Sequence, residues 1–410
     1  MDSTELEKGY SWAQRFEKLV IIYLITYVAA MQMTPWGFVT EPFLFKPITK
    51  FLAGLIGIEI TGSGSGSGDT TYDYCKFVTL IIIALLIWFV LQLLSKNISI
   101  EKLRKYSFTI ARYFLIYFLL IYGFSKVFPL QFRDGLSYYS LAKTFGETSP
   151  MGLLWNFMAH SRPFTFFVGV AEVSAGIFLI FRRTSLIGSL LSCAVMFNVF
   201  LLNMCFDVPV KLFSAHLLFF SLYLLYFYKV RIYKFLLTSE SIPEMASYGI
   251  HWSKEAEKVI LILKRIFVFI LVSLIIGSPL GLGDFISSNK KENFELEGLH
   301  NIINFEGYRK NKLLDGKKWL KVIFRNNIGM NILFDDETKE YITVNIDTSE
   351  NTIDDGSDGL LHYNINEDTI QINGMWKGDS LSIRSIIKLK EDFLLNSRGF
   401  HWINESPFNR

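Results

Sequence analysis

Seven runs of apolar residues determine most of what this chain can fold into. Each run is roughly 17–22 residues long, enough for a helix to cross the roughly 30 Å hydrocarbon core of a bilayer. Hydrophobic residues make up 51% of the chain and charged residues 19%, whereas a soluble domain carries about a quarter charged residues. The sequence therefore predicts a polytopic α-helical membrane protein with spans at residues 17–33, 76–95, 109–127, 164–181, 184–204, 211–229 and 260–279.

The Lys and Arg residues beside these runs predict the orientation of the spans. Basic residues collect in the cytoplasmic flanks of membrane proteins. Here they lie before the first span and in the three connections between the second and third, the fourth and fifth, and the sixth and seventh spans. All of these positions share one side if the N-terminus is cytoplasmic. We therefore expect a protein of the bacterial cytoplasmic (inner) membrane, with an uncleaved first span and an extracytoplasmic C-terminal region.

Charge and cysteine content narrow the classes of function. The net charge is only +3, so nucleic acid is not expected as a partner. The cysteines Cys75, Cys193 and Cys205 form no Cys-x-x-Cys pair, which argues against a dithiol redox centre and a metal knuckle. Cys75 and Cys205 both fall near the expected outer surface, so a disulfide between them is left open.

From about residue 285 the sequence pattern changes from long apolar runs to short alternating ones. Turn signals such as Asp335-Asp336, Asp354-Asp355-Gly356 and Lys377-Gly378-Asp379 separate these runs. This pattern predicts an antiparallel β sandwich or small barrel. The alternating runs begin at Trp319, Met330, Tyr341, His362, Thr369 and Ser380.

These features divide the chain into four expected parts. Residues 1–104 form an N-terminal transmembrane pair with an external interfacial loop, and 105–235 form a four-helix membrane core. Residues 236–284 hold a cytoplasmic linker and the seventh span, and 285–410 form the extracytoplasmic β-domain. The first external loop contains a Gly/Ser stretch at 62–68 that is a flexible coil by composition, either natural or engineered.

Polar residues inside the apolar runs mark the candidate site. Glu172, Asn198 and His216 lie in three consecutive spans, and at about 1.5 Å per residue all three fall in the outer half of the bilayer. Ionisable groups in hydrocarbon are costly and commonly face a bundle interior where they serve a site. The ligand-binding candidates are these three residues with Lys126, Asn203 and Asp207 near the outer rim.

Two interpretations of this polar set stay open. The residues can share protons or bind a polar headgroup, or they can form an interhelical hydrogen-bond network that only holds the bundle together. Glu172 and His216 are expected to reach a common cavity if they form one site. Arg112 is set apart from this group, because it lies near the cytoplasmic end of its span and is expected to snorkel.

Spans three to six resemble the DoxX-like family of bacterial four-helix membrane proteins. The matching pieces are Gly123-Phe-Ser-Lys126, Gly169-Val-Ala-Glu172 with Gly176, the Arg182-Arg183 turn, and the helical pair that bears Asn and His. The likeness covers about residues 105–235. It implies a membrane bundle linked to quinone-dependent oxidation of sulfur compounds or to oxidative-stress complexes, although the missing dithiol departs from a thiol-redox role.

Two functions follow from the sequence. In the first, an outward-facing bundle binds membrane lipid or a quinone-like molecule, as part of a membrane redox system. In the second, the protein is a non-enzymatic assembly or sensing subunit whose residues 285–410 bind an envelope protein partner. The sequence contains no motif that assigns a reaction.

Overall fold

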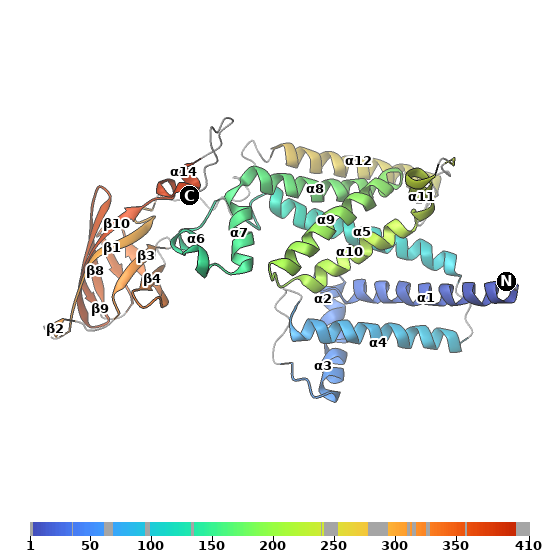
Figure 1. The fold of residues 1–410 in the computed structure, drawn as a ribbon, viewed down its shortest axis with the longest axis horizontal. Helices are drawn as coiled ribbons and strands as arrows, with labels where there is room; N and C mark the ends of the chain where they lie inside the picture. Colours follow the sequence, from blue (N-terminus) through green and yellow to red (C-terminus); the bar gives the residue numbers. More distant parts are fainter. Residues whose placement is uncertain are drawn as a thin grey trace. The chain divides into compact units, whose positions relative to one another are not determined.

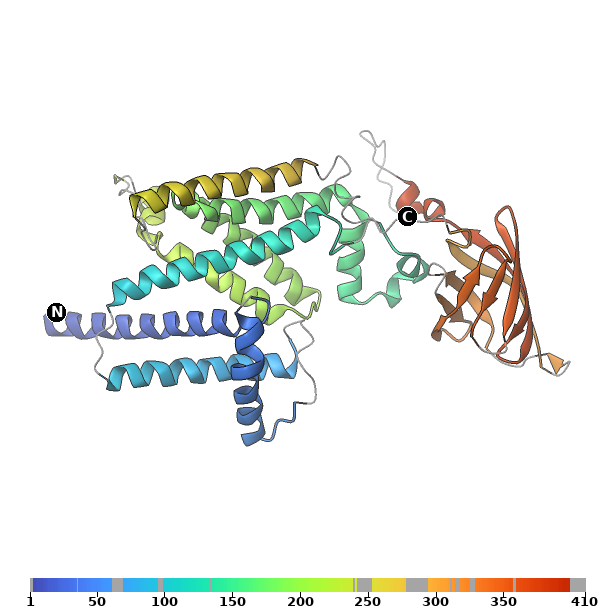
Figure 2. The same cartoon turned by 180° about the vertical axis from the view of Figure 1, so that it is seen from behind.

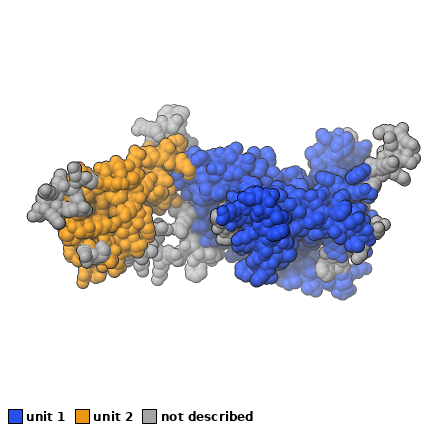
Figure 3. All heavy atoms as spheres, turned by 90° about the horizontal axis from the view of Figure 1, so that it is seen from below, with its two compact units in different colours: residues 1–132, 150–287 blue, residues 133–149, 288–410 orange. Residues whose placement is uncertain are grey.

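The chain forms two compact units, coloured separately in Figure 3. In the computed structural model the described residues are 3–34, 36–60, 69–94, 99–132, 135–238, 240–241, 253–277, 294–309, 312–313, 317–324, 329–356 and 359–398. The helical unit comprises Met1–Phe132 and Pro150–Ser287, and the β unit comprises Arg133–Ser149 and Ser288–Arg410. Residues 133–149, which lie between two helices of the helical unit in the sequence, therefore group with the strands.

The helical unit contains long helices (Figures 1 and 2), most of which share one apolar core, and smaller apolar clusters lie between the others. Its elements are α1 (Ser3–Ala30), α2 (Gly37–Thr40), the π-helix η1 (Glu41–Phe45), α3 (Lys46–Leu55), α4 (Thr71–Leu93), α5 (Ile100–Val127), α7 (Pro150–His160), α8 (Arg162–Ile180), η3 (Arg182–Thr184), α9 (Ser185–Cys205), α10 (Lys211–Tyr226), α11 (Lys229–Leu237) and α12 (Lys254–Gly277). Ile21 and Leu24 of α1 pack with Phe118 of α5 and Phe220 of α10 in this core.

Five of the described helices are long and apolar enough to cross a membrane: α4, α5, α8, the η3–α9 segment and α12. A sixth is reached if α10 and α11 are one span, but their axes differ by 73°. The expected first span lies in α1, which is not among the five. Three charged residues, Arg15, Glu17 and Lys18, lie near the middle of α1, and Glu17 pairs with Arg104 of α5 at 2.5 Å. The predicted number of seven is thus not reached by these helices.

Local sequence signals explain where several helices begin. Thr70 and Asp73 form a capping box at the start of α4. Pro150 occupies the first position of α7, where the missing N–H of proline costs no helical hydrogen bond. At the C-terminal end of α5, the Arg162 guanidinium donates to the carbonyl oxygens of Lys126, at 2.9 Å, and of Val127. A cation is favourable there because the last carbonyls of a helix carry partial negative charge.

The β unit is a nearly closed antiparallel barrel, which confirms the barrel form of the predicted β-domain. Its strands are β1 (Leu299–Arg309), β2 (Lys312–Leu313), β3 (Trp319–Phe324), β4 (Gly329–Phe334), β5 (Lys339–Thr343), β6 (Asn345–Asp347), β7 (Thr352–Asp354), β8 (Leu360–Asn366), β9 (Thr369–Trp376) and β10 (Asp379–Lys388). They lie in the order β5-β4-β3-β1-β10-β9-β8-β7-β6, and β2 pairs with β1.

The barrel interior follows the predicted alternation of apolar and polar residues. Along β8 the residues Leu361 and Tyr363 point inward, and along β9 Ile370 and Ile372 do so. The turn from β9 to β10 places Lys377 and Gly378 at positive φ, 49° and 83°, as a two-residue hairpin with matching strand twist requires. The short elements α6 (Tyr138–Ala142), η2 (Phe145–Glu147), η6 (Lys390–Asp392) and α14 (Leu394–Ser397) complete the unit.

A small second core explains why residues 133–149 group with the barrel. Ala142 of α6 is buried against Leu299 and Ile323, and Tyr138 packs on the same cluster. Lys321 of β3 donates from Nζ to the carbonyl oxygen of Ala142 at 3.0 Å. The predicted Gly/Ser coil at 62–68 and the aromatic tail after Arg398 lie outside the described residues.

Candidate functional site

Two glycines bring α5 and α8 into close antiparallel contact. A Cβ added to Gly169 would lie 2.7 Å from the Gly123 carbonyl oxygen and 2.8 Å from the Val127 nitrogen. A Cβ added to Gly123 would lie 2.6 Å from the Val173 side chain. Small residues at such positions allow helix backbones to approach closely. The crossing therefore depends on the Gly123 and Gly169 positions that the sequence marks.

This crossing places Lys126 of α5 against Glu172 of α8. The Nζ atom of Lys126 lies 2.9 Å from Oε2 of Glu172, and the two residues are 7% and 1% exposed. Lys126 Nζ also donates to the Tyr122 carbonyl oxygen at 3.3 Å and lies 5.8 Å from the centre of the Tyr122 ring. Within the described part of the chain, Oε1 of Glu172 has no hydrogen-bond partner. Glu172 therefore keeps one buried acceptor that the ion pair does not use.

His216 has a different set of partners. Its Nε2 lies 2.6 Å from the Tyr23 hydroxyl, and its Nδ1 lies 2.7 Å from the Leu212 carbonyl oxygen. Its ring stacks on Tyr27 with centroids 3.9 Å apart and an interplanar angle of 5°, and meets Phe77 edge-on at 5.6 Å. Both ring nitrogens are occupied, so the structure places His216 with α1 and α4 and shows no contact with Glu172.

The remaining predicted site residues are dispersed. Asn198 is exposed on α9, whereas Asn203 is 6% exposed and its Nδ2 has no partner among the described residues. Asp207 has an exposed side chain at positive φ and accepts from Lys211 Nζ at 2.7 Å. Of the six candidates, the structure brings together Lys126 and Glu172.

Asp69, which lies just before α4 in the sequence, caps α10. Its carboxylate oxygens accept from the backbone nitrogens of Lys211 at 2.8 Å and Leu212 at 2.9 Å. A carboxylate is favourable at this position because the first N–H groups of a helix have no intrahelical partner. The sequence signal, an acidic residue after a flexible segment, does not indicate which helix receives it.

A second buried carboxylate escaped sequence reasoning. Glu41 of η1 is 4% exposed, accepts from the Tyr72 hydroxyl and lies 3.6 Å from Lys76 Nζ. Tyr72 and Lys76 are four residues apart on α4, so they share one helix face. The spacing of Tyr72 and Lys76 indicated a polar helix face that could receive a carboxylate. It did not indicate Glu41, because Glu41 precedes a proline in a segment expected to lie at the membrane interface.

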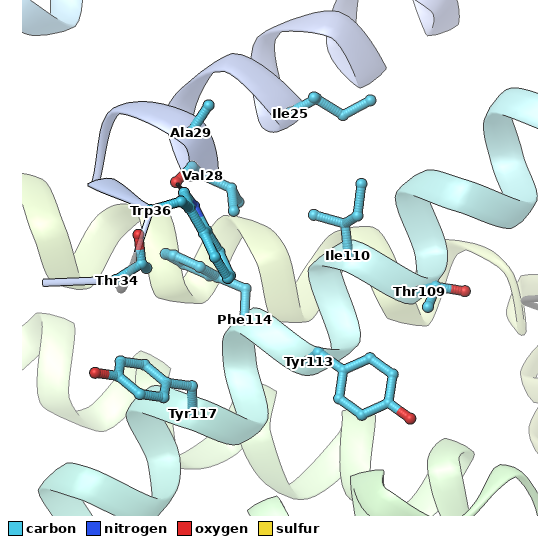
Figure 4. A pocket seen from close by; sticks show the side chains of 10 residues that line it. All are labelled: Ile25, Val28, Ala29, Thr34, Trp36, Thr109, Ile110, Tyr113, Phe114 and Tyr117. Atoms are coloured by element: carbon cyan, nitrogen blue, oxygen red, sulfur yellow. Dashed lines mark hydrogen bonds between the residues drawn. The ribbon is translucent and has the colours of Figure 1, made fainter. Parts of the chain in front are cut away.

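A separate apolar cavity of about 490 Å³ lies between α1, α5 and the segment that joins α1 to α2. Figure 4 shows the residues that line it, which come from α1, from α5 and from the joining segment that carries Thr34 and Trp36. None of the six predicted site residues lines it. Its lining residues are Ile25, Val28, Ala29, Thr34, Trp36, Thr109, Ile110, Tyr113, Phe114 and Tyr117.

Hydrogen bonds hold the wall of this cavity in place. The Trp36 indole nitrogen donates to the Val28 carbonyl oxygen at 3.0 Å. The Tyr117 hydroxyl donates to the Met33 carbonyl oxygen at 2.8 Å, and the Tyr122 hydroxyl contacts Met33 Sδ at 3.9 Å. Tyr122 thus connects the Lys126–Glu172 pair to the segment that lines the cavity.

The described residues contain no cluster of three or more His, Cys, Asp or Glu side chains that could hold a metal ion. Cys75, Cys193 and Cys205 are free thiols, so Cys75 and Cys205 are not joined here.

The chain is similar to a protein of Bacillus subtilis strain 168, the uncharacterized protein YwoB. The two are 30% identical over 115 residues, which are 28% of this chain and 72% of YwoB. The chain belongs to the family of this protein. No family model and no solved structure matches it.

Proposed function

We propose that this YwoB relative is an integral membrane protein whose helical unit binds an apolar, lipid-like molecule in the cavity between α1 and α5. Five apolar helices of spanning length support the membrane location. The observation that carries the proposal is the cavity itself. Its volume of about 490 Å³ lies within the range of small-molecule sites, roughly 300–1,000 Å³, which are lined mostly by apolar and aromatic groups.

The lining favours a chain-like or planar apolar ligand. Trp36, Phe114 and Tyr117 offer ring faces, while Ile25, Val28 and Ile110 offer aliphatic surface. The hydroxyls of Thr109 and Tyr117 already donate to backbone carbonyl oxygens, so each can still accept a hydrogen bond from one polar group of a ligand. A lipid acyl chain and the isoprenoid tail of a quinone share this chemistry, and the DoxX-like resemblance supports the quinone. In this proposal, Lys126 and Glu172 do not line the cavity. They support its wall indirectly, because Lys126 contacts Tyr122 and Tyr122 contacts Met33.

Filling the cavity tests the proposal. Ala29→Trp places an indole in the cavity, and Ala13→Trp makes the same change at an exposed position of α1 outside it. Both proteins would be purified from membranes, and their extracted lipids and quinones identified by mass spectrometry. We expect Ala29→Trp to lose a molecule that the parent protein and Ala13→Trp retain. If all three carry the same molecules in the same amounts, the cavity is not the binding site.

The second candidate function assigns the activity to the β unit. Its interior is filled by apolar side chains, with Ile353, Leu361 and Ile370 each 0% exposed. Binding by this unit would therefore use its outer surface, as an assembly or sensing subunit uses one for a protein partner. Co-purification of a partner that is lost when residues 285–410 are deleted would favour this function over lipid binding.

A further inference from the structure

The apolar cavity of the helical unit offers a ligand hydrogen-bond acceptors rather than donors. Four of its lining side chains donate to backbone carbonyl oxygens within the described chain: Thr34 to Met31 at 2.7 Å, Trp36 to Val28 at 3.0 Å, Thr109 to Lys105 at 2.8 Å and Tyr117 to Met33 at 2.8 Å. A hydroxyl or an indole N–H has one proton to donate. These four groups therefore have no donor left for a ligand.

Tyr113 is the fifth lining side chain with a donor group, and its hydroxyl is engaged from outside the cavity. Arg112 and Lys264 are both hydrogen-bond partners of the Tyr113 side chain. Neither of these cations lines the cavity. Arg112 is only 3% exposed, so it does not snorkel to the surface as expected. The Tyr113 hydroxyl is therefore directed at the two cations and not at a ligand.

Tyr117 keeps one acceptor that a ligand can use. Its phenolic oxygen can accept a hydrogen bond while its proton is donated to the Met33 carbonyl oxygen. The surroundings are apolar: Phe114, one turn earlier on α5, is 4% exposed, and Val28 of α1 is 5% exposed. A polar group that lacks a hydrogen bond in such surroundings is unfavourable. A ligand that brings a donor is satisfied here, whereas a ligand that brings only acceptors is not.

The end of α1 adds an electrostatic preference for a donor. Val28 and Ala29 line the cavity and belong to the last turn of α1, which ends at Ala30. The last carbonyl groups of a helix carry partial negative charge. Trp36 and Thr40 donate to two of these carbonyl oxygens but bring no net charge. The hydrogen of a ligand O–H group is favoured beside this helix end, whereas a carbonyl or carboxylate oxygen is disfavoured.

We propose that the cavity selects a membrane-soluble alcohol or phenol, whose hydroxyl donates to Tyr117, over a ketone, quinone or carboxylate of the same size. This inference rests on the proposed function of the cavity and names the class of its ligand. A quinol presents O–H donors, whereas a quinone presents only carbonyl acceptors, so the cavity fits the reduced form. Diacylglycerols and isoprenoid alcohols share this chemistry, because each places a hydroxyl on an apolar body.

The test compares farnesol with farnesyl methyl ether, in which a methyl group replaces the hydroxyl proton. Binding of each probe to the full-length protein in detergent is measured by native mass spectrometry. We expect farnesol to bind about two- to tenfold more tightly, which is the value of one neutral hydrogen bond. Tyr117→Phe keeps the ring and removes the acceptor, so this preference should disappear. Tyr106→Phe makes the same change at an exposed position of α5 outside the cavity and should keep the preference.

A second pair of probes removes the difference in size. Decylubiquinol and decylubiquinone differ by two hydrogen atoms, and under anaerobic conditions we expect the parent protein to bind the quinol more tightly and Tyr117→Phe to bind both alike. If the parent protein binds none of the four probes, the proposed function of the cavity fails and the inference fails with it. If the parent binds them without preference for the hydroxyl form, or if Tyr117→Phe keeps the preference, the cavity still binds apolar molecules but the inferred selectivity is overturned.

Discussion

Replacing Gly169 with alanine should separate α5 from α8. The new Cβ would lie 2.7 Å from one backbone atom of α5 and 2.8 Å from another, so no side-chain rotation relieves the contact. Ordinary contact requires roughly 3.5 Å, so the helices must move apart by about 0.8 Å. Such overpacking costs about 1–3 kcal/mol. The shift also acts on Lys126, whose own Cβ would lie 3.0 Å from the new methyl group.

Gly176→Ala is the matched control on the same helix. Its Cβ would meet Leu120 side-chain atoms at 3.2 and 3.4 Å, and that side chain can rotate away. Both changes gain about 1 kcal/mol from the greater helix propensity of alanine, and this gain cancels when the two variants are compared. The difference in unfolding free energy should therefore be about 2 kcal/mol.

Thermal unfolding of the purified protein in one detergent, followed by circular dichroism at 222 nm, measures this difference. For a unit of this size about 2 kcal/mol corresponds to roughly 4–8 °C in melting temperature. We expect Gly169→Ala to melt lower than Gly176→Ala by that amount. Equal melting temperatures for the two variants would show that the close approach at Gly169 does not determine the α5–α8 packing.

Three further predictions concern the ion pair, the barrel and the topology. Lys126→Met and Glu172→Gln should each lower the free energy of unfolding by about 3–5 kcal/mol, because each breaks a buried ion pair. The double variant should lose less than the sum of the two single losses, because the residues interact. Strictly additive losses in denaturant unfolding would refute this coupling. Burial lowers the pKa of His300 to about 4 from its usual 6.5, so its neutral form is favoured in the folded barrel. The contribution of His300 to the free energy of unfolding is fully present above pH 6.5 and is lost as the pH falls to 4. The free energy of unfolding of the β unit, measured with urea, should therefore fall by about 3 kcal/mol between these pH values. A His300→Gln variant with the same pH profile as the parent protein would contradict this. A reporter enzyme fused after residue 290 should be active only outside the cytoplasm; cytoplasmic activity would reverse the proposed orientation.

The strands that alternate regularly were predictable, and the longest strand was not. The runs from Trp319, Met330, Thr369 and Ser380 all appear as strands of the barrel. β1 escaped because Ile302 and Ile303 are adjacent apolar residues, and a bulge between Ile302 and Asn304 interrupts its pairing with β10. A bulge inserts a residue and shifts the period of two on which strand prediction rests.

The depth of a residue in a helix can be counted from sequence, but the side of the helix that it occupies is harder to predict. Asn198 and Asn203 are five residues apart on α9, which is roughly 140° around the helix axis. One is exposed and the other is buried. The small residues Ser185, Ser189 and Ser192 mark the buried face of α9, and Asn203 shares that face whereas Asn198 does not, so this stripe was the signal that counting depth left out. The partners of His216 come from α1, which the sequence placed outside the four-helix core.

The Lys126–Glu172 pair shows what counting Cα positions leaves out. Counted at about 1.5 Å per residue, Glu172 lies roughly 12 Å below the outer end of its expected span, whereas Lys126 closes the preceding span at the same rim. In the structure, Gly169 lies level with Lys126 and Val127, so Glu172 is only three residues, or about 4.5 Å, further along α8. Side chains on a helix lean toward its N-terminus, and α5 and α8 are antiparallel. Lys126 therefore leans back toward Tyr122, as its contact with that carbonyl oxygen shows, while Glu172 leans toward the start of α8. The two charged groups approach each other from different depths, so an ion pair forms between residues whose Cα positions do not match.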